Sequence, residues 1–243
     1  MEVWGLTDTG NVREQNQDAY RIERLSDNAL LAVVCDGMGG ARSGNVASRL
    51  ASEVFSEEVK RSFSAEHTPQ EAERILRGAA SLANIVVFEQ SQLSEEYSGM
   101  GTTLVAVLLY ERASLVLNIG DSRAYHINAD GVTCVTTDHS VVELMVQRGE
   151  LTPEQAKNHP SKNLITRAVG TGKQVFADVF HVSAAKGDCF LLCSDGLSNL
   201  MADQEILFEV IHGARKDDCC QRLLEIAKER GAPDNVTAVL IAL

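Results

Sequence analysis

Short hydrophobic runs separated by turn residues dominate the chain and predict β-strands. Residues 30–35 are apolar at every position, and residues 101–110 are rich in Val, Leu and Thr, which is typical of buried strands. Residues 8–18, by contrast, are rich in turn formers. The pattern predicts strands at residues 3–7, 30–35, 101–110, 114–119, 123–127, 132–135, 175–182, 189–193 and 236–243.

Amphipathic helical periodicity replaces the strand pattern from residue 43 and again from residue 69. In the first stretch Val46, Leu50 and Val54 fall on one stripe, and the second repeats this spacing as far as Val87. Two further helices are expected near the C-terminal end, at residues 203–211 and 217–230.

A helical interlude interrupts the strands between about residues 139 and 170. Ser140 with Glu143 three positions later is a capping-box signature, and Thr152 followed by Pro153 begins a second short helix. Because helices placed between strands in this way often cover a site, we expect residues 139–170 to form a flap.

The order of the elements predicts the fold class. Consecutive short strands between residues 101 and 135 favour antiparallel pairing, and the helices come in pairs instead of alternating regularly with strands. This is the pattern of an α+β layered sandwich. No Pro-, Gly- or Ser-rich linker divides the 243 residues, so we predict a single domain over residues 1–243.

Composition limits the classes of function. With 44% hydrophobic and 23% charged residues, and no apolar run long enough to cross a bilayer, we expect a globular protein without a transmembrane helix. No signal-peptide pattern opens the chain, and the six cysteines lack zinc-binding spacing, so we predict a cytoplasmic protein with reduced thiols. A formal net charge of −12 argues against nucleic acids or anionic membranes as partners.

Three acids share a local setting, a strand end beside a residue that tolerates unusual backbone angles: Asp36 before Gly37, Asp195 before Gly196, and Asp234 before Asn235. Each alone is typical of an ordinary turn. Asp18 and Asp121 lie in similar turns, and carboxylates gathered at one end of stacked sheets repel each other unless a divalent cation lies between them.

An all-oxygen site of this kind suits Mg²⁺ or Mn²⁺, and no His or Cys cluster indicates zinc. Two such ions lower the pKa of a shared water, which predicts hydrolysis of a phosphate ester. Arg13, upstream of the acids, would bind the phosphate dianion in bidentate fashion. An acidic protein needs such positive charge to hold phosphate.

Eight short motifs, in order along nearly the whole chain, resemble the metal-dependent protein serine/threonine phosphatases of type 2C, in their bacterial branch. The motifs are RxxNQD at 13–18, DGMGG at 36–40, MGTTL at 100–104, GDSRAY at 120–125, TDHS at 137–140, HPSKNLITRAVG at 159–170, SDGL at 194–197 and DN at 234–235. The resemblance implies a four-layer α-β-β-α sandwich with a binuclear centre at one end.

The resemblance also implies roles for individual residues. Asp36 would bridge two Mn²⁺ or Mg²⁺ ions, the Gly37 carbonyl would complete one, and Asp195 and Asp234 would hold the other. Asp18 would act through water, and Arg13 would hold the phosphate. Asp121 and Asp195 match the ligands of a third, weaker ion. The substrates would be phosphorylated proteins, made by a serine/threonine kinase and hydrolysed by metal-activated water, and we expect a monomer.

Two positions depart from the family pattern. Gln17 stands where many relatives carry Glu, which removes a charge from a water-mediated contact to the metals. Met38 replaces the His proposed as general acid in eukaryotic relatives, so that role does not transfer.

Several of these residues also have simpler interpretations. Arg13 could be a surface arginine, and Asp121 and Asp138 could form turns at strand ends. His139 and His159 are assigned structural roles because the sequence shows no carboxylate partner for either. The alternative to an enzyme is a catalytically silent relative that binds phosphoproteins as a regulatory module. That alternative predicts a missing core carboxylate, and none is missing.

Overall fold

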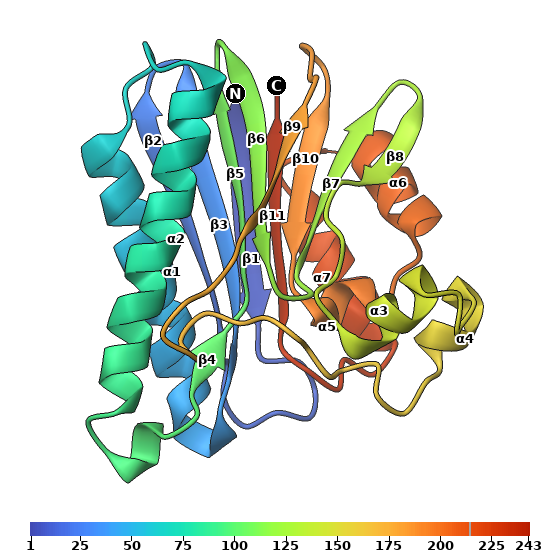
Figure 1. The fold of residues 1–243 in the computed structure, drawn as a ribbon. Coiled ribbons are helices and arrows are strands. Elements are labelled where there is room, and N and C mark those ends of the chain that lie inside the picture. The colour runs from blue at the N-terminus through green and yellow to red at the C-terminus, as the bar shows by residue number, and fades with distance from the viewer. Residues whose placement is uncertain (214) are drawn as a thin grey trace.

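Two antiparallel β-sheets lie face to face, and helices cover the outer face of each (Figure 1). The computed structural model describes residues 1–213 and 215–243, with the side chains of α1 described from Ser43 onward, so the predicted motif residue Gly40 lies outside the described side chains. One sheet has the order β1-β11-β10-β7-β8 and the other β2-β3-β5-β6-β9, with β4 paired to β3. The predicted four-layer α-β-β-α sandwich is confirmed.

Most of the nine predicted strands are present among the eleven strands of the described residues. The eleven strands are β1 Glu2–Asp8, β2 Asp18–Ser26, β3 Ala29–Met38, β4 Gly101–Thr102, β5 Leu104–Tyr110, β6 Ala113–Ile119, β7 Arg123–Asn128, β8 Gly131–Cys134, β9 Asp178–Val182, β10 Cys189–Cys193 and β11 Val236–Ala242. The helices are α1 Gly40–Ser62, α2 Pro69–Ser91, α3 Val141–Gln147, α4 Pro153–Lys157, α5 Asp195–Ser198, α6 Asp203–His212 and α7 Cys219–Glu229, with a 3-10 turn, η1, at Glu95–Tyr97.

Strand β3 shows why the layers form. Its side chains alternate between two apolar environments: Leu30 and Val34 face the other sheet, whereas Leu31 and Val33 face the helices. Because both faces of the strand are buried, almost every position must be apolar. Helices α1 and α2 cover this sheet, and α6 and α7 cover the other. Strand β3, which carries Asp36, is therefore held rigidly between two apolar layers.

The structure corrects the predicted strands at three points. Strand β2 was not predicted, because polar residues such as Arg21 and Glu23 interrupt its apolar pattern. The run at residues 101–110 is split at Thr103 into β4 and β5. The run at residues 175–182 becomes a strand only at Asp178, since the preceding segment packs against α2, where Arg77 donates to the Ala177 carbonyl.

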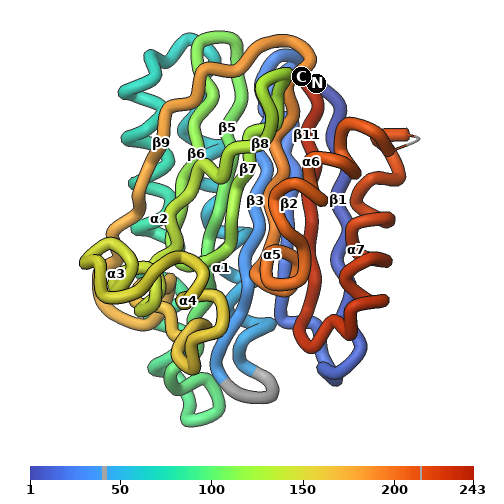
Figure 2. Tube along the Cα trace, turned by 90° about the vertical axis from the view of Figure 1, so that its right-hand side faces the viewer, coloured from blue at the N-terminus to red at the C-terminus, as the bar shows by residue number. Residues whose placement is uncertain are grey.

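The predicted insert, residues 139–170, contains α3 and α4 and lies at one end of the sandwich (Figures 1 and 2). Its base is a short antiparallel pairing. The Val141 N–H donates to the Leu164 carbonyl at 2.8 Å, and the Thr166 N–H donates to the His139 carbonyl at 2.7 Å. A further bridge joins Val169 to Thr102, next to β5. The two ends of the insert are thus tied to each other and to the sheet that carries Asp36.

Two compositional expectations can be compared with the described residues. None of the described helices is long and apolar enough to span a membrane. All six cysteines are free thiols, and most of them are buried in the strands and helices where the sequence places them.

Candidate metal centre

Asp36 lies on β3 directly opposite Asp18 on β2. The strand continues past Asp36 to Met38, so the acid is not at the strand end as predicted. Its backbone is held on both sides: the Asp36 N–H donates to Thr103 Oγ1 at 2.9 Å, and the Thr103 N–H donates to the Asp36 carbonyl at 2.9 Å. The break between β4 and β5 at Thr103 therefore fixes the backbone from which the Asp36 carboxylate extends.

Gly37 follows at a point of very close packing. A side chain there would come within 2.0 Å of the Gly44 carbonyl oxygen on α1, and within 2.6 Å of the Gln17 carbonyl oxygen. The Gly37 N–H donates to the Gln17 carbonyl at 3.1 Å. Only glycine allows this approach, which keeps the backbone beside Asp36 rigid.

Asp195 and Asp234 come from the other sheet. Asp195 is the first residue of α5, immediately after β10, and its Oδ2 accepts from Asn199 Nδ2 at 3.0 Å. Asp234 precedes β11 and pairs with Arg13 at 2.8 Å. Two strands of one sheet and one strand of the other thus direct acids to the same end of the sandwich.

Asn235 attaches the loop that carries Arg13 to the start of β11. Its Nδ2 donates to the carbonyls of Thr9 and Gln15 at 2.8 and 3.0 Å, and its Oδ1 accepts from the Gln17 N–H at 2.8 Å. The sequence motif identified Asn235 only as a turn residue. These contacts show that it holds the segment from Thr9 to Gln17 against Asp234.

The acids surround a cavity of about 630 Å³. Arg13 is the only cationic side chain among the described residues that line it, and Met38, Asn163 and Ile165 line other parts. Asn163 and Ile165 belong to the insert, which therefore forms one wall. The acidic and glycine residues predicted for the site that line this cavity are Asp36, Gly37, Asp121, Asp195 and Asp234.

Burial and mutual repulsion make these acids hard to ionise. Burial, followed by the charges of Asp18 and Asp195, raises the pKa of Asp36 well above its usual value. Burial raises the pKa of Asp121 to about 7, and it also raises the pKa of Asp195, with the charge of Asp234 adding to the effect. A bound cation would reverse this effect, because positive charge favours the ionised carboxylates.

Asp18 lies buried behind the cavity and joins the two sheets. Its Oδ2 accepts from Ser194 Oγ at 2.7 Å and from Thr237 Oγ1 at 2.6 Å, both from the opposite sheet. Its Oδ1 is buried without a hydrogen-bond partner among the described groups. Burial raises the Asp18 pKa to about 7, against these two hydrogen bonds. Ser194 and Thr237 are site residues that the sequence analysis missed, because they are 176 and 219 positions away.

This donor set fits Mg²⁺ or Mn²⁺. In the described residues no group of three or more His, Cys, Asp or Glu side chains is arranged to hold a metal ion as the side chains stand, but Asp36, Asp121, Asp195 and Asp234 line one cavity. Mg²⁺ is usually held by one or two carboxylates and keeps several waters, so it requires no closed protein cage. The unpartnered Asp18 oxygen also suits such a site, since it can accept a hydrogen bond from a water of the ion.

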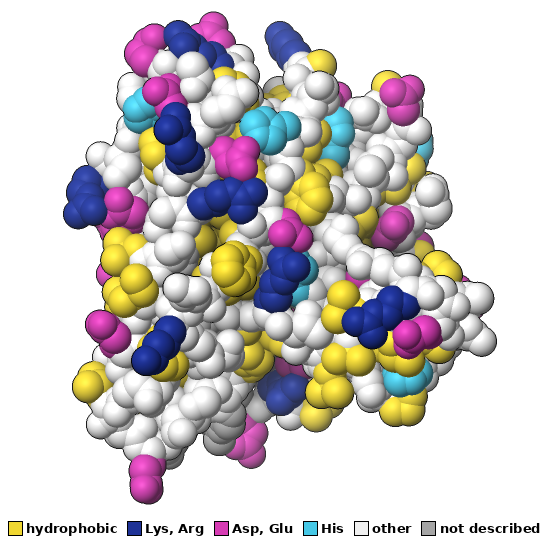
Figure 3. Space-filling view, viewed as in Figure 1, with side chains coloured by type: hydrophobic (Ala, Val, Ile, Leu, Met, Phe, Trp, Pro, Cys, Tyr) yellow, Lys and Arg dark blue, Asp and Glu magenta, His cyan; other side chains and the backbone are white. Residues whose placement is uncertain are grey.

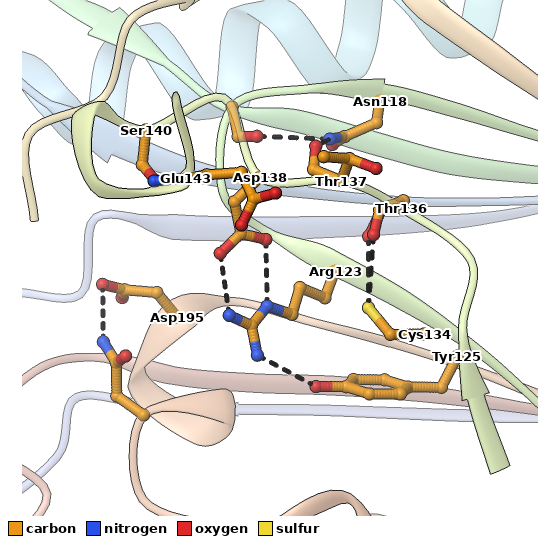
Figure 4. A network of polar contacts seen from close by, with 12 residues as sticks. Asn118, Arg123, Tyr125, Cys134, Thr136, Thr137, Asp138, Ser140, Glu143 and Asp195 are labelled. Atoms are coloured by element: carbon orange, nitrogen blue, oxygen red, sulfur yellow. Dashed lines mark hydrogen bonds and ion pairs between the residues drawn. The ribbon is translucent and has the colours of Figure 1, made fainter. Parts of the chain in front are cut away.

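Asp138 does not line the cavity. Arg123 holds it in a bidentate ion pair, with Nε to Oδ1 at 2.9 Å and Nη2 to Oδ2 at 2.7 Å (Figure 4). The same guanidinium donates to the Tyr125 hydroxyl. Asp138 is therefore neither a simple turn former nor a free carboxylate. Sequence reasoning gave no role to Arg123, although a charged residue that begins a predicted strand was a usable signal.

The sequence shows no carboxylate partner for His139, but the structure provides one. His139 Nε2 lies 2.9 Å from Oδ2 of Asp178, a residue 39 positions away at the start of β9. For His159, the described contact is to its own segment, where Nδ1 accepts from the Ser161 N–H at 3.1 Å.

The outer surface of the insert is partly apolar. Leu144 and Leu164 are 40% and 56% exposed. Hydrophobic side chains also gather around α3 and α4 in the space-filling view (Figure 3). The acidic cavity is thus bordered by a segment that offers apolar contact to a partner.

Comparison with known proteins agrees with this geometry. Residues 11–240 match the family model described as Protein phosphatase 2C. The serine/threonine phosphatase stp of Listeria monocytogenes is 36% identical over 238 residues, 97% of this chain and 93% of that protein.

Solved structures agree as well. The S. agalactiae serine/threonine phosphatase superposes with a TM-score of 0.92 at 31% identity, covering 100% of this chain and 99% of that one. The catalytic domain of the phosphatase PstP, in complex with two manganese ions, gives a TM-score of 0.82 at 31% identity, covering 98% and 96%. The match to the family model, the shared fold and the clustered acids together show that the chain belongs to the protein phosphatase 2C family, a family of metal-dependent phosphatases.

Proposed function

We propose that this protein hydrolyses phosphoserine and phosphothreonine in phosphorylated proteins at a binuclear Mn²⁺ or Mg²⁺ centre. The observation that carries the proposal is the cavity in which acids from both sheets surround Arg13, the one cationic side chain among the described residues that line it. Divalent ions would neutralise the acids, and the remaining positive charge would favour a phosphate dianion.

Asp36 would bridge the two ions, with the Gly37 carbonyl on one and Asp195 and Asp234 on the other. When bound, the ions supply Lewis acidity and positive charge, which make water an effective nucleophile near neutral pH. Asp121 and Asp195 would hold a third, weaker ion. The cavity that Asp36, Gly37, Asp195 and Asp234 line together and the unpartnered oxygen of Asp18 support this assignment.

The chain's own groups orient the reactants. The Arg13 guanidinium, which lies against Asp234, would turn to the phosphate oxygens and bind two of them. Asp18, held by Ser194 and Thr237, would accept a hydrogen bond that orients water with its free Oδ1. Met38 lines the cavity but carries no proton, so protonation of the leaving oxygen must come from another group.

The substrate class follows from the surroundings of the cavity. Asn163 and Ile165 of the insert form one wall, and the exposed Leu164 lies between them in the chain. An apolar border of this kind suits a polypeptide carrying the phosphate better than a small phosphate ester. We infer a cytoplasmic setting, where the six free thiols would stay reduced, and a serine/threonine kinase as the source of the substrates.

The silent-relative alternative is disfavoured, because Asp36, Asp195 and Asp234 are all present and line one cavity. The deciding experiment measures phosphate release from a phosphothreonine peptide and from p-nitrophenyl phosphate. We expect turnover with Mn²⁺ or Mg²⁺, loss in excess chelator and recovery when metal is restored. Phosphopeptide binding without turnover under any metal condition would favour the regulatory alternative.

A further inference from the structure

His139 is buried where three segments meet. Its ring nitrogen Nδ1 lies 3.0 Å from the Gly120 N–H, and its Nε2 lies 2.9 Å from Asp178 Oδ2. Its backbone pairs with the same glycine, because the His139 N–H donates to the Gly120 carbonyl at 2.9 Å. Only 6% of the residue is exposed. Ring and backbone thus both hold the Gly120 peptide.

The contacts define which nitrogen carries the proton. The Gly120 N–H can only donate, so Nδ1 must be an acceptor without hydrogen. In a neutral imidazole the proton then lies on Nε2, which donates to the Asp178 carboxylate. Nη1 of Arg167 also lies 3.1 Å from Nε2, but it donates to Asp178 Oδ1 at 3.0 Å. It cannot donate to Nε2, because a neutral ring has only one acceptor nitrogen.

Gly120 is a sensitive point because Asp121 follows it. Its φ of +108° is a conformation that residues with a side chain rarely adopt, and a Cβ would lie 2.6 Å from Thr103 Cγ2. Asn118 Nδ2 fastens the same turn, donating to the Gly120 and Thr137 carbonyls at 3.2 and 3.0 Å (Figure 4). The direction of the Asp121 carboxylate therefore depends on how this peptide is held.

The other side of His139 is the base of the insert. The His139 carbonyl accepts from the Thr166 N–H at 2.7 Å, and Arg167, next in the chain, shares Asp178 with the ring. Asp178 begins β9, the strand into which the chain leads after the insert. One side chain thus connects the start of the insert, its end and the turn before Asp121.

We propose that His139, as the Nε2–H tautomer, is a positioning residue that sets the Asp121 carboxylate relative to the base of the insert. It touches neither substrate nor ions and acts through the Gly120 peptide. The consequence for turnover rests on the proposed phosphatase activity, whereas the tautomer and its contacts do not.

The first test is independent of catalysis. Long-range ¹H–¹⁵N spectra of the wild-type, metal-free and Mg²⁺-loaded protein report which imidazole nitrogen carries hydrogen, and His139→Asn identifies the signal. We expect the Nε2–H pattern in both states at pH 7.5. An Nδ1–H tautomer, or a doubly protonated ring, would overturn the proposal.

The second test compares two amides. Asn at position 139 places an acceptor near the Nδ1 position and can keep the Gly120 contact, whereas Gln reaches toward Asp178 and leaves the Gly120 N–H without its acceptor. We expect His139→Gln to lower kcat on a phosphothreonine peptide tenfold or more and much less on p-nitrophenyl phosphate. We expect the kcat of His139→Asn to stay within about threefold of wild type on both substrates. The Gly120 N–H keeps an acceptor in this variant, and replacing one hydrogen-bond acceptor by another costs little.

Controls separate positioning from packing. His181→Gln alters an exposed histidine of β9 that pairs with Glu73. This variant should leave kcat on both substrates unchanged. The double variant His139→Gln with Asp121→Ala should be no worse than Asp121→Ala alone, because both changes act through one carboxylate. Equal losses in the Asn and Gln variants, or additive losses in the double variant, would show that the ring only fills space. A wild-type protein without turnover would instead refute the proposed function and leave the tautomer result standing.

Discussion

Asp18 and Asp36 face each other as register partners on β2 and β3; Asp18 is buried, and Asp36 is half-buried where it lines the cavity. Two adjacent carboxylates of this kind are unfavourable in the ionised form, because burial desolvates them and each repels the other. The site is thus electrostatically strained near neutral pH unless positive charge is present. This relationship connects protein stability to pH and to metal.

We expect the metal-free protein to become more stable on acidification from pH 8 to pH 5.5. Burial raises the Asp18 pKa to about 7 from an ordinary 3.8, so between these values the folded state binds more protons than the unfolded state. Stability must then fall as pH rises through that window, by up to about 1.4 kcal/mol per pH unit for each such group. Urea unfolding in chelator at several pH values measures the slope.

Two comparisons make that pH prediction specific. Saturating Mn²⁺ should flatten or reverse the slope, since bound cations favour the ionised acids. Asp18→Asn should reduce the slope of stability against pH in the metal-free protein. A metal-free protein whose stability does not change between pH 5.5 and 8 would contradict the prediction.

Replacing Asp36 by Asn should remove nearly all activity and leave the fold intact. A neutral amide keeps the shape of the side chain but cannot bridge two cations. We expect activity to fall by more than about 100-fold, because replacing even a residue that only supports a metal ligand costs up to about that much. The metal-free variant should unfold at no lower temperature than wild type, because it lacks one buried acid. Phosphatase assays and circular dichroism melting measure both effects.

The matched control is Asp130→Asn, an exposed acid in the turn between β7 and β8. It should behave as wild type in both measurements. Loss of folding together with activity in Asp36→Asn would show that Asp36 has a structural role beyond metal binding.

Replacing Arg13 by Ala should mainly raise KM for phosphopeptides, by about tenfold or more, because a charge-assisted contact to phosphate is lost from ground and transition states alike. Arg13→Lys should restore only part of the affinity, since an ammonium lacks the planar fork. Steady-state kinetics at saturating Mn²⁺ separate this effect from the lost pairing with Asp234. An unchanged KM with a reduced kcat would show that Arg13 contacts the phosphate only in the transition state.

Replacing Asp121 by Ala should leave the first two ions bound, because Asp36 and Asp234 would still hold them. Turnover should suffer through loss of a water that protonates the leaving serine or threonine oxygen. The kcat on a phosphopeptide should therefore fall much more than the kcat on p-nitrophenyl phosphate, whose leaving group needs no proton. Kinetics on both substrates with metal analysis test this, and an equal loss on both would refute it.

The sequence by itself determined the local elements and most of the acids. Alternation and apolar runs predict β3, β5 and β10 because a strand between two layers must be apolar on both faces. The motifs singled out Asp36, Asp195 and Asp234, which line one cavity in the structure, because each lies within or beside a strand whose local pattern is visible. Strand β2 was not predicted, because its polar residues weaken that pattern.

Only the tertiary structure decided the polar partners. Asp18 meets Ser194 and Thr237 because β2 of one sheet lies against the ends of β10 and β11 of the other. His139 meets Asp178 because the chain returns from the insert into β9 beside the turn it left. Hydrogen bonds between residues far apart in the chain leave no periodic trace in the sequence, since they depend on how packed layers bring strand ends together.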